Sequence, residues 1–197
     1  MNKVKTVSLA IIQNKWFCLA WLIFGCAYMT WFGFLENPMQ YTASMIGLDY
    51  PVGFIFWGVF QSISLVLNVL YLYRRYGYSS RFGYVCLIIA AICIGITVNV
   101  PSTEIFGLQL VMHWSTALLF AIFNAIAMGL CLVNKAKHSK KFMATFVLFI
   151  AMLLSMIVLL IIFGKSGIIE KIPMWGAYLI LLLTNFTGLY KESLPKQ

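Results

Sequence analysis

His113 lies within a long apolar stretch and is the residue there best suited to proton chemistry, because an imidazole changes its charge near neutral pH. Two carboxylates, Glu104 and Glu170, come just before apolar stretches and are expected on the same side of the molecule. A histidine with nearby carboxylates could carry out acid–base chemistry or hold a metal ion. We hypothesise that His113 and Glu170 line one outward-opening cavity, with Trp114 and Trp175 near its rim.

The same residues also fit a purely structural arrangement. Glu170 could pair with Lys165 or Lys171 at the surface, where ion pairs contribute little stability. His113 could instead bond to a backbone carbonyl. The sequence does not decide between this arrangement and a shared cavity.

Polar side chains recur at helical spacing within three apolar stretches. Their separations bring each set onto one helix face, and we expect the three faces to converge on one interior, because polar groups are costly in hydrocarbon. Gln61, Asn124 and Asn185 could bond between helices, worth roughly 0.6–2 kcal/mol each, or could line a path for a ligand or ion. The sets are Gln61, Ser64 and Asn68; His113, Thr116 and Asn124; and Thr184, Asn185 and Thr187.

Familiar catalytic and cofactor motifs are missing from the sequence. The other histidine, His138, lies in a basic stretch expected on the opposite side, which excludes a zinc site built from three histidines. The five cysteines all fall within apolar stretches and have no Cys-x-x-Cys spacing. There is no Gly-rich phosphate loop and no Gly-x-Ser-x-Gly turn. We therefore expect no catalytic residue, cofactor or metal ion.

The apolar stretches are long enough to cross a membrane. Of the 197 residues, 62% are hydrophobic and 10% are charged, whereas about 25% are charged in soluble domains. A helix of about 20 apolar residues spans a bilayer with its backbone fully bonded. Trp31 and Tyr50 fit the aromatic belt of a membrane interface. The sequence predicts one all-α domain over 1–197, a six-helix transmembrane bundle with helices near 16–35, 52–73, 82–100, 107–133, 142–163 and 172–190.

The net charge of +9 is distributed in a way that predicts the orientation of the bundle. Of the 14 Lys and Arg residues, all but Lys165 and Lys171 lie in stretches expected on one side. Cytoplasmic loops are enriched in Lys and Arg, so we expect both termini in the cytoplasm and the loop 36–51 outside a bacterial plasma membrane. Basic residues dispersed between apolar stretches do not form the patch that nucleic-acid binding needs.

Three segments, taken in order, resemble a known family. The resemblance is to the domain of unknown function 998 family of six-helix prokaryotic membrane proteins, which is similar to the FRAG/DRAM/Sfk group of eukaryotic membrane proteins. It implies a six-helix bundle with Ser44, His113 and Glu170 on its outer side. The segments are Ser44-Met45-Ile46-Gly47 before Pro51; Pro101 followed by His113, Ala117 and Phe120; and Gly167-Ile168-Ile169-Glu170-Lys171-Ile172 before Trp175.

The sequence departs from the family's pattern at two positions. Met45 stands where an acid is common after the serine, which puts acid-dependent chemistry in the outer loop in doubt. Lys171 stands where arginine is common after the glutamate, and this change keeps the charge. The resemblance implies no activity, because the bacterial family has none assigned.

The eukaryotic relatives are tied to lipid handling. By analogy we expect a non-enzymatic protein that binds or moves a lipid or small amphiphile from the outer leaflet, with membrane lipids as its partners. A proton- or cation-coupled transporter, or the substrate-binding subunit of an importer, ranks second because no Asp or Glu lies near the middle of an apolar stretch. A membrane-embedded hydrolase that uses the outer acid and histidine residues ranks third.

Overall fold

The computed structural model describes residues 14–102 and 107–191, and the regular structure of these residues is helical. Six of the helices are long and apolar enough to cross a membrane, and the remaining one, α3, has seven residues. The chain is therefore an all-α, multi-pass membrane protein, as the sequence predicts. Its helices are α2 (Lys15–Phe32), α3 (Ala43–Asp49), α4 (Pro51–Arg75), α5 (Arg81–Asn99), α6 (Leu108–Ala136), α7 (Lys140–Phe163) and α8 (Gly167–Phe186).

Small polar residues determine where most of these helices begin. Each such residue has an extended backbone, and its side-chain oxygen accepts a hydrogen bond from a backbone N–H in the first turn. These N-caps satisfy donors that have no partner within the helix, and replacing one by Ala typically costs about 1 kcal/mol. α4 begins instead with Pro51, whose missing N–H is not needed in a first turn. The capping residues are Asn14, Thr42, Ser80, Ser139 and Ser166.

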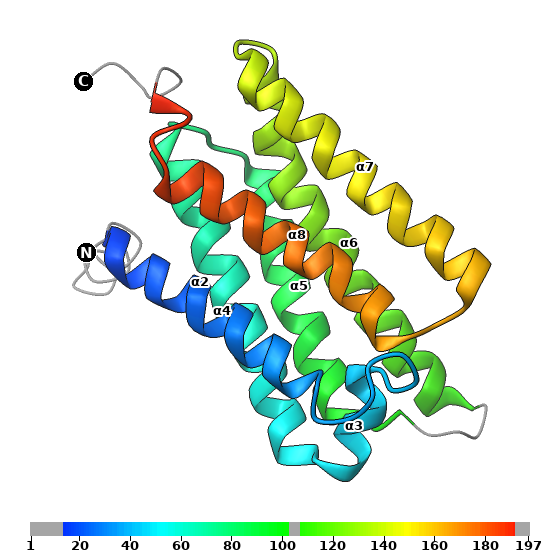
Figure 1. Ribbon diagram of the computed structural model, residues 1–197. Helices are drawn as coiled ribbons and strands as arrows, with labels where there is room; N and C mark the ends of the chain where they lie inside the picture. The colour runs from blue at the N-terminus through cyan, green and yellow to red at the C-terminus, as the bar shows by residue number, and fades with distance from the viewer. Residues whose placement is uncertain (1–13, 103–106, 192–197) are drawn as a thin grey trace.

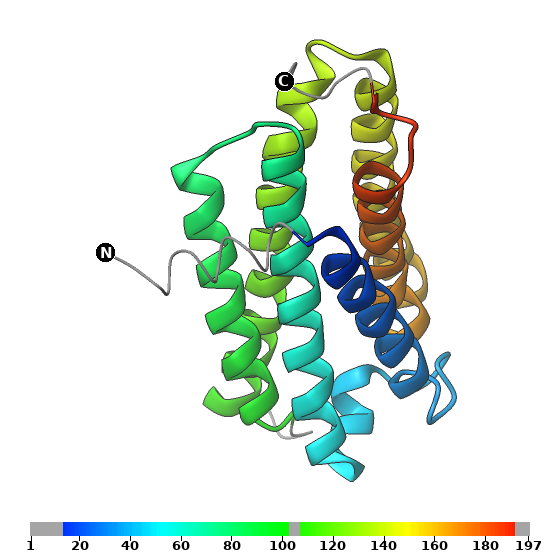
Figure 2. The same ribbon diagram turned by 90° about the vertical axis from the view of Figure 1, so that its left-hand side faces the viewer.

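α4 lies at the centre of the bundle, where it contacts α2, α3, α5, α6 and α8 (Figure 1). The connections between the long helices lie at two opposite ends of the bundle (Figures 1 and 2). At the end that we call the α3 end, α3 packs beside the start of α4, near the α7–α8 connection. At the opposite end, which we call the basic end, lie the described Lys and Arg residues other than Lys165 and Lys171.

α7 runs along the margin of the bundle and contacts α6 and α8. Its most apolar 18-residue window has the highest mean hydropathy among the six long helices, yet only 6% of that window is buried, against 44% of the corresponding window of α4. Its buried residues, Phe142, Thr145 and Phe149, all lie in its first half. A helix that is apolar on all sides and uncovered by protein suits contact with lipid.

The structure corrects several expected boundaries. The last helix begins at Gly167, five residues before the expected 172, because Ser166 caps it, so Glu170 lies inside its first turn. The same helix ends at Phe186, before residue 190. The first helix ends at Phe32, three residues before the expected 35. The loop expected over 36–51 contains α3, which is too short to give a periodic apolar pattern in the sequence.

Candidate functional site

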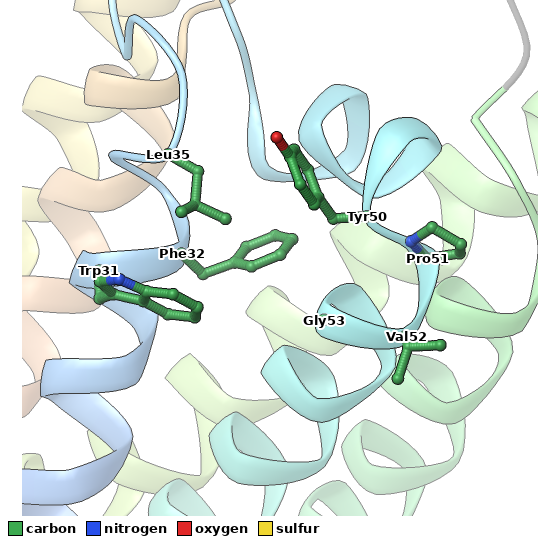
Figure 3. A pocket seen from close by; sticks show the side chains of 7 residues that line it. All are labelled: Trp31, Phe32, Leu35, Tyr50, Pro51, Val52 and Gly53. Atoms are coloured by element: carbon green, nitrogen blue, oxygen red, sulfur yellow. The ribbon is translucent and has the colours of Figure 1, made fainter.

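An apolar hollow of about 210 Å³ opens at the α3 end, between the last turn of α2 and the first turn of α4. Trp31, Tyr50 and Val52 are exposed, so the hollow is open at the surface of the bundle. The complete lining, drawn in Figure 3, is Trp31, Phe32 and Leu35 from α2 and the turn after it, and Tyr50, Pro51, Val52 and Gly53 from the corner between α3 and α4.

Close packing of α2 on α4 fixes the base of this hollow. A Cβ on Gly53 would lie only 2.9 Å from the Phe32 ring, so the glycine permits the close approach of the two helices. The Tyr28 hydroxyl donates to the Gly53 carbonyl at 3.2 Å and ties the same two helices together. Phe32 is fully buried and stacks on Phe54. The hollow therefore has a rigid aromatic base and an open mouth.

His113 is buried, with 2% of its surface exposed. Its Nδ1 lies 2.7 Å from the Val100 carbonyl oxygen, and because a carbonyl can only accept, Nδ1 carries the proton. The imidazole also stacks on the Phe54 ring, with the ring centroids 6.2 Å apart. The structure thus gives His113 the backbone bond that the sequence offered as the alternative to a cavity, and His113 does not line the hollow.

Lys165 brings two of the expected site residues together. Its Nζ lies 3.5 Å from a carboxylate oxygen of Glu170 and 5.7 Å from the centre of the Trp114 ring. Both partners of the ion pair are partly exposed, at 42% and 34%, so the pair contributes little to stability by itself. Glu170 also lies within hydrogen-bonding reach of the backbone N–H of Ala43, the first residue of α3. Glu170 therefore links the start of α8 to the start of α3.

Ser44 and Trp175 make hydrogen bonds inside the protein. The buried Ser44 hydroxyl lies 3.0 Å from the hydroxyl of Thr42. Trp175 Nε1 donates to the Thr30 hydroxyl at 2.9 Å, and its ring stacks on Phe34 at a centroid distance of 6.3 Å. These contacts hold α3 in shape and pack α8 against α2.

Glu104, the remaining acid of the expected outer set, lies outside the described residues. Among the residues that the structure does describe, no cluster of three or more His, Cys, Asp or Glu side chains could hold a metal ion.

Lys171, which the sequence offered only as a surface partner of Glu170, is instead buried between α2 and α8 with 3% of its surface exposed. Its Nζ donates to the Gly167 carbonyl at 3.2 Å and lies 5.2 Å from the centre of the Phe34 ring. A Cβ on Gly33 would overlap Lys171 Cε. The ammonium therefore sits beside the last turn of α2, where helix carbonyls carry partial negative charge. No sequence signal separates Lys171 from Lys165, because both flank the same helix start.

Gln61 joins three helices near the middle of the bundle. Its Nε2 donates to the Gly25 carbonyl of α2 at 3.0 Å, and its Oε1 accepts from the Tyr178 hydroxyl of α8 at 2.8 Å. Gln61 and Tyr178 are buried, and Ser64 adjoins them where Gly25 leaves room. Both ends of the amide are thus bonded to neighbouring helices.

Asn68 and Asn185 continue these contacts toward the basic end. Asn68 Nδ2 donates to the Cys18 carbonyl of α2 at 3.1 Å, and Asn185 Nδ2 donates to the Asn68 carbonyl at 2.9 Å. Both asparagines are fully buried. We call the four side chains that join α2, α4 and α8 the polar seam: Gln61, Asn68, Tyr178 and Asn185.

Asn124 of α6 stands apart from the polar seam. Its Nδ2 donates to the Phe120 carbonyl of its own helix at 2.9 Å. Its Oδ1, like those of Asn68 and Asn185, has no hydrogen-bond partner in the described part of the chain. Of the three polar faces expected to converge, those on α4 and α8 meet, and they do so with α2. The face on α6 carries His113, whose ring bonds to Val100 instead.

No family model, curated protein or solved structure matches this chain.

Proposed function

We propose that this protein binds part of a lipid or small amphiphile in the hollow between α2 and α4, without catalysing a reaction. The observation that carries the proposal is the open apolar hollow at one end of a membrane-crossing bundle. Trp31 and Tyr50 at its mouth are both exposed. Such rings prefer the boundary between hydrocarbon and head groups, which is also where an amphiphile changes from tail to head.

The size of the hollow suits one segment of a chain. Pockets that enclose a whole small molecule usually measure about 300–1,000 Å³, and this hollow measures about 210 Å³. The rest of the tail would stay in the bilayer. Because lipid is as apolar as the hollow, the tail gains packing contacts there and little hydrophobic energy. Selectivity must then come from the head group.

We also propose that the protein lies in a bacterial plasma membrane with the α3 end outside. Nine of the eleven Lys and Arg residues in the described part of the chain lie at the basic end, and cytoplasmic loops are the ones enriched in these residues. Membership of the family that the sequence resembles would imply the same orientation, because that resemblance puts Ser44, His113 and Glu170 on the outer side. An outward-facing hollow would meet amphiphiles in the outer leaflet.

Filling the hollow tests the proposed function. Val52 is 65% exposed and lines the hollow, so Val52→Trp should occupy it without disturbing the packed interior. The protein is reconstituted in nanodiscs with a lipid that carries a photoreactive diazirine in its tail, and the labelled peptides are mapped by mass spectrometry. We expect labelling of residues 31–35 and 50–53 in the wild type, and a several-fold loss in the variant.

Val111→Trp is the matched control. Val111 is also exposed, lies in the first turn of α6 at the same end, and lines no part of the hollow. It should leave the labelling unchanged. The proposal fails if the hollow is labelled no more than the lipid-facing surface of α7, or if both Trp variants give the wild-type pattern.

A further inference from the structure

The turn between α6 and α7 concentrates positive charge at the basic end. α6 ends at Ala136 and α7 begins at Lys140, so only residues 137–139 separate the two helices. This turn is the outermost connection at the basic end (Figures 1 and 2). The short connection keeps the basic side chains of the turn close together. They are Lys135, Lys137, Lys140 and Lys141, of which the last three are exposed.

No acid of the described chain offsets this charge. Glu36, Asp49 and Glu170, the Asp and Glu residues that the structure describes, all belong to the α3 end. Glu192 lies outside the described residues, and one carboxylate could not neutralise four lysines. The end of α6 and the start of α7 carry partial charges of opposite sign and similar size. The lysines therefore make the turn positive.

Lys140 stands at the head of an exposed apolar stripe on α7. Residues that follow it at helical spacing lie on the same face of the helix. The buried residues of α7, Phe142, Thr145 and Phe149, lie on the opposite face, against the bundle. The stripe therefore faces lipid. Its members are between 38% and 58% exposed and are Met143, Val147, Ile150 and Leu154.

The length of this stripe matches one leaflet of a bilayer. At about 1.5 Å per residue, the helix rises about 16 Å from Met143 to Leu154. Half of a hydrocarbon core of about 30 Å is about 15 Å. Lys140 then lies at the depth of the head groups, where lipid phosphates lie. Neither a free phosphate ion nor a nucleic acid would use the apolar part, whereas a phospholipid would use both parts.

We propose that the α6–α7 turn and the stripe below it bind an anionic phospholipid, such as phosphatidylglycerol. Lys137 and Lys140 contact its head group, and one acyl chain lies along the stripe. A lysine near an anionic membrane surface contributes about fivefold to the attraction. This contribution shrinks as added salt screens the exposed charges. The site lies at the opposite end of the bundle from the hollow, so it does not depend on what the hollow binds.

Photolabelling with two matched lipids tests the proposal in the full-length protein. Nanodiscs of phosphatidylcholine receive a small fraction of a probe with a diazirine in its tail and either a phosphatidylglycerol or a phosphatidylcholine head. Mass spectrometry then measures labelling of residues 143–154. We expect the phosphatidylglycerol probe to label this segment at least about fivefold more. The double variant Lys137→Gln, Lys140→Gln should remove most of this preference, and Lys137→Arg, Lys140→Arg should keep it.

Lys15→Gln, Arg81→Gln is the matched control. It removes the same charge from the same end, at two exposed positions. These residues begin α2 and α5, whereas α7 packs on α6 and α8. The preference for phosphatidylglycerol along α7 should therefore stay at the wild-type value in this variant.

Three results would overturn the proposal. Equal labelling by the two probes would show that α7 does not select anionic lipid. A preference that survives in the Gln variant of the turn, or falls as much in the control, would show that these lysines do not form the site. Inorganic phosphate is also added and compared with sodium chloride at equal ionic strength. Loss of the preference in phosphate alone would show that the turn binds a free anion and not a lipid.

Discussion

The buried side chain of Lys171 requires a glycine at position 33. The backbone of Gly33 has φ −74° and ψ −1°, which any residue can adopt, so conformation does not demand a glycine there. The demand is steric, because a Cβ would overlap Lys171 Cε. Lys171 is 3% exposed and held by the Gly167 carbonyl and the Phe34 ring, so it has little freedom to move aside.

Gly33→Ala should therefore destabilise the protein by about 1–3 kcal/mol, the usual cost of overpacking. In a Lys171→Ala background the same substitution should cost much less, since the atom it meets is gone. The two changes should be coupled by about 1 kcal/mol or more in a double-mutant cycle. Unfolding in detergent titrations gives the free energies. Gly95→Ala serves as the control, because a Cβ there meets no atom within 4 Å. Additive effects of Gly33→Ala and Lys171→Ala on the unfolding free energy would contradict the steric account.

The stabilisation that the Tyr178 hydroxyl contributes through its one hydrogen bond in the polar seam should also be measurable. Tyr178→Phe removes the 2.8 Å bond to Gln61 and leaves a buried amide oxygen unpaired, so we expect a loss of about 1 kcal/mol. Tyr84→Phe is the matched control, because Tyr84 is 38% exposed and its hydroxyl makes no hydrogen bond within the described residues. Equal unfolding free energies for the two variants would show that the seam bond contributes nothing.

At the scale of helices, the effect of a polar side chain on stability depends on whether it bonds to its own helix or to another. Asn68 donates to Cys18 of α2 and receives the Asn185 amide at its carbonyl. Asn124 donates only to Phe120, one turn earlier in α6. The two asparagines look alike in the sequence, since both fall within apolar helices at spacings that align with other polar residues. Their partners lie on different elements.

Replacing each asparagine by leucine should separate the two cases. Asn68→Leu removes a bond between helices and inserts a branched side chain into a fully buried position, so the melting temperature should fall. Asn124→Leu removes only a bond within one helix, at a partly buried position, so stability should change little or increase. Thermal unfolding of the two variants in the same detergent compares them directly. A larger loss for Asn124→Leu would contradict this account.

The elements that could be predicted from the sequence are those with a long signal. Six apolar stretches of membrane-spanning length gave the six long helices, and helical spacing placed Gln61 and Asn185 in the interior, where both are fully buried. α3 was missed because seven residues give no clear period. The start of α8 was missed because Ser166 and Glu170 read as a polar loop, although Ser166 is an N-cap. Pairing between helices, which buries Lys171 and shapes the hollow, depends on contacts that no local pattern encodes.

At the scale of the whole molecule, the two ends of the bundle differ in charge, and only one of them carries the short helix α3. The basic end carries most of the Lys and Arg of the described chain. The α3 end carries the short helix, whose first residue, Ala43, lies near Glu170 of α8. The segment before α3 is also tied to α8, by the hydrogen bond from Ile168 N–H to the Pro38 carbonyl at 2.9 Å. The hollow opens at this covered end. Its access to one leaflet or the other is therefore set by the orientation of the entire bundle.

Charge distribution predicts that orientation, and cysteine labelling measures it. On a background in which the five cysteines are replaced by alanine, single cysteines are introduced as Gln40→Cys at the α3 end and His138→Cys at the basic end. Both positions are exposed, whereas Thr42 in the same segment as Gln40 is only 1% exposed and would react poorly from either side. With the Lys and Arg of the basic end in the cytoplasm, a membrane-impermeant maleimide added to intact cells should label position 40 and spare position 138. After the cells are broken open, both positions should react, which controls for their accessibility. Labelling of position 138 alone in intact cells would reverse the orientation, and the hollow would then face amphiphiles of the inner leaflet.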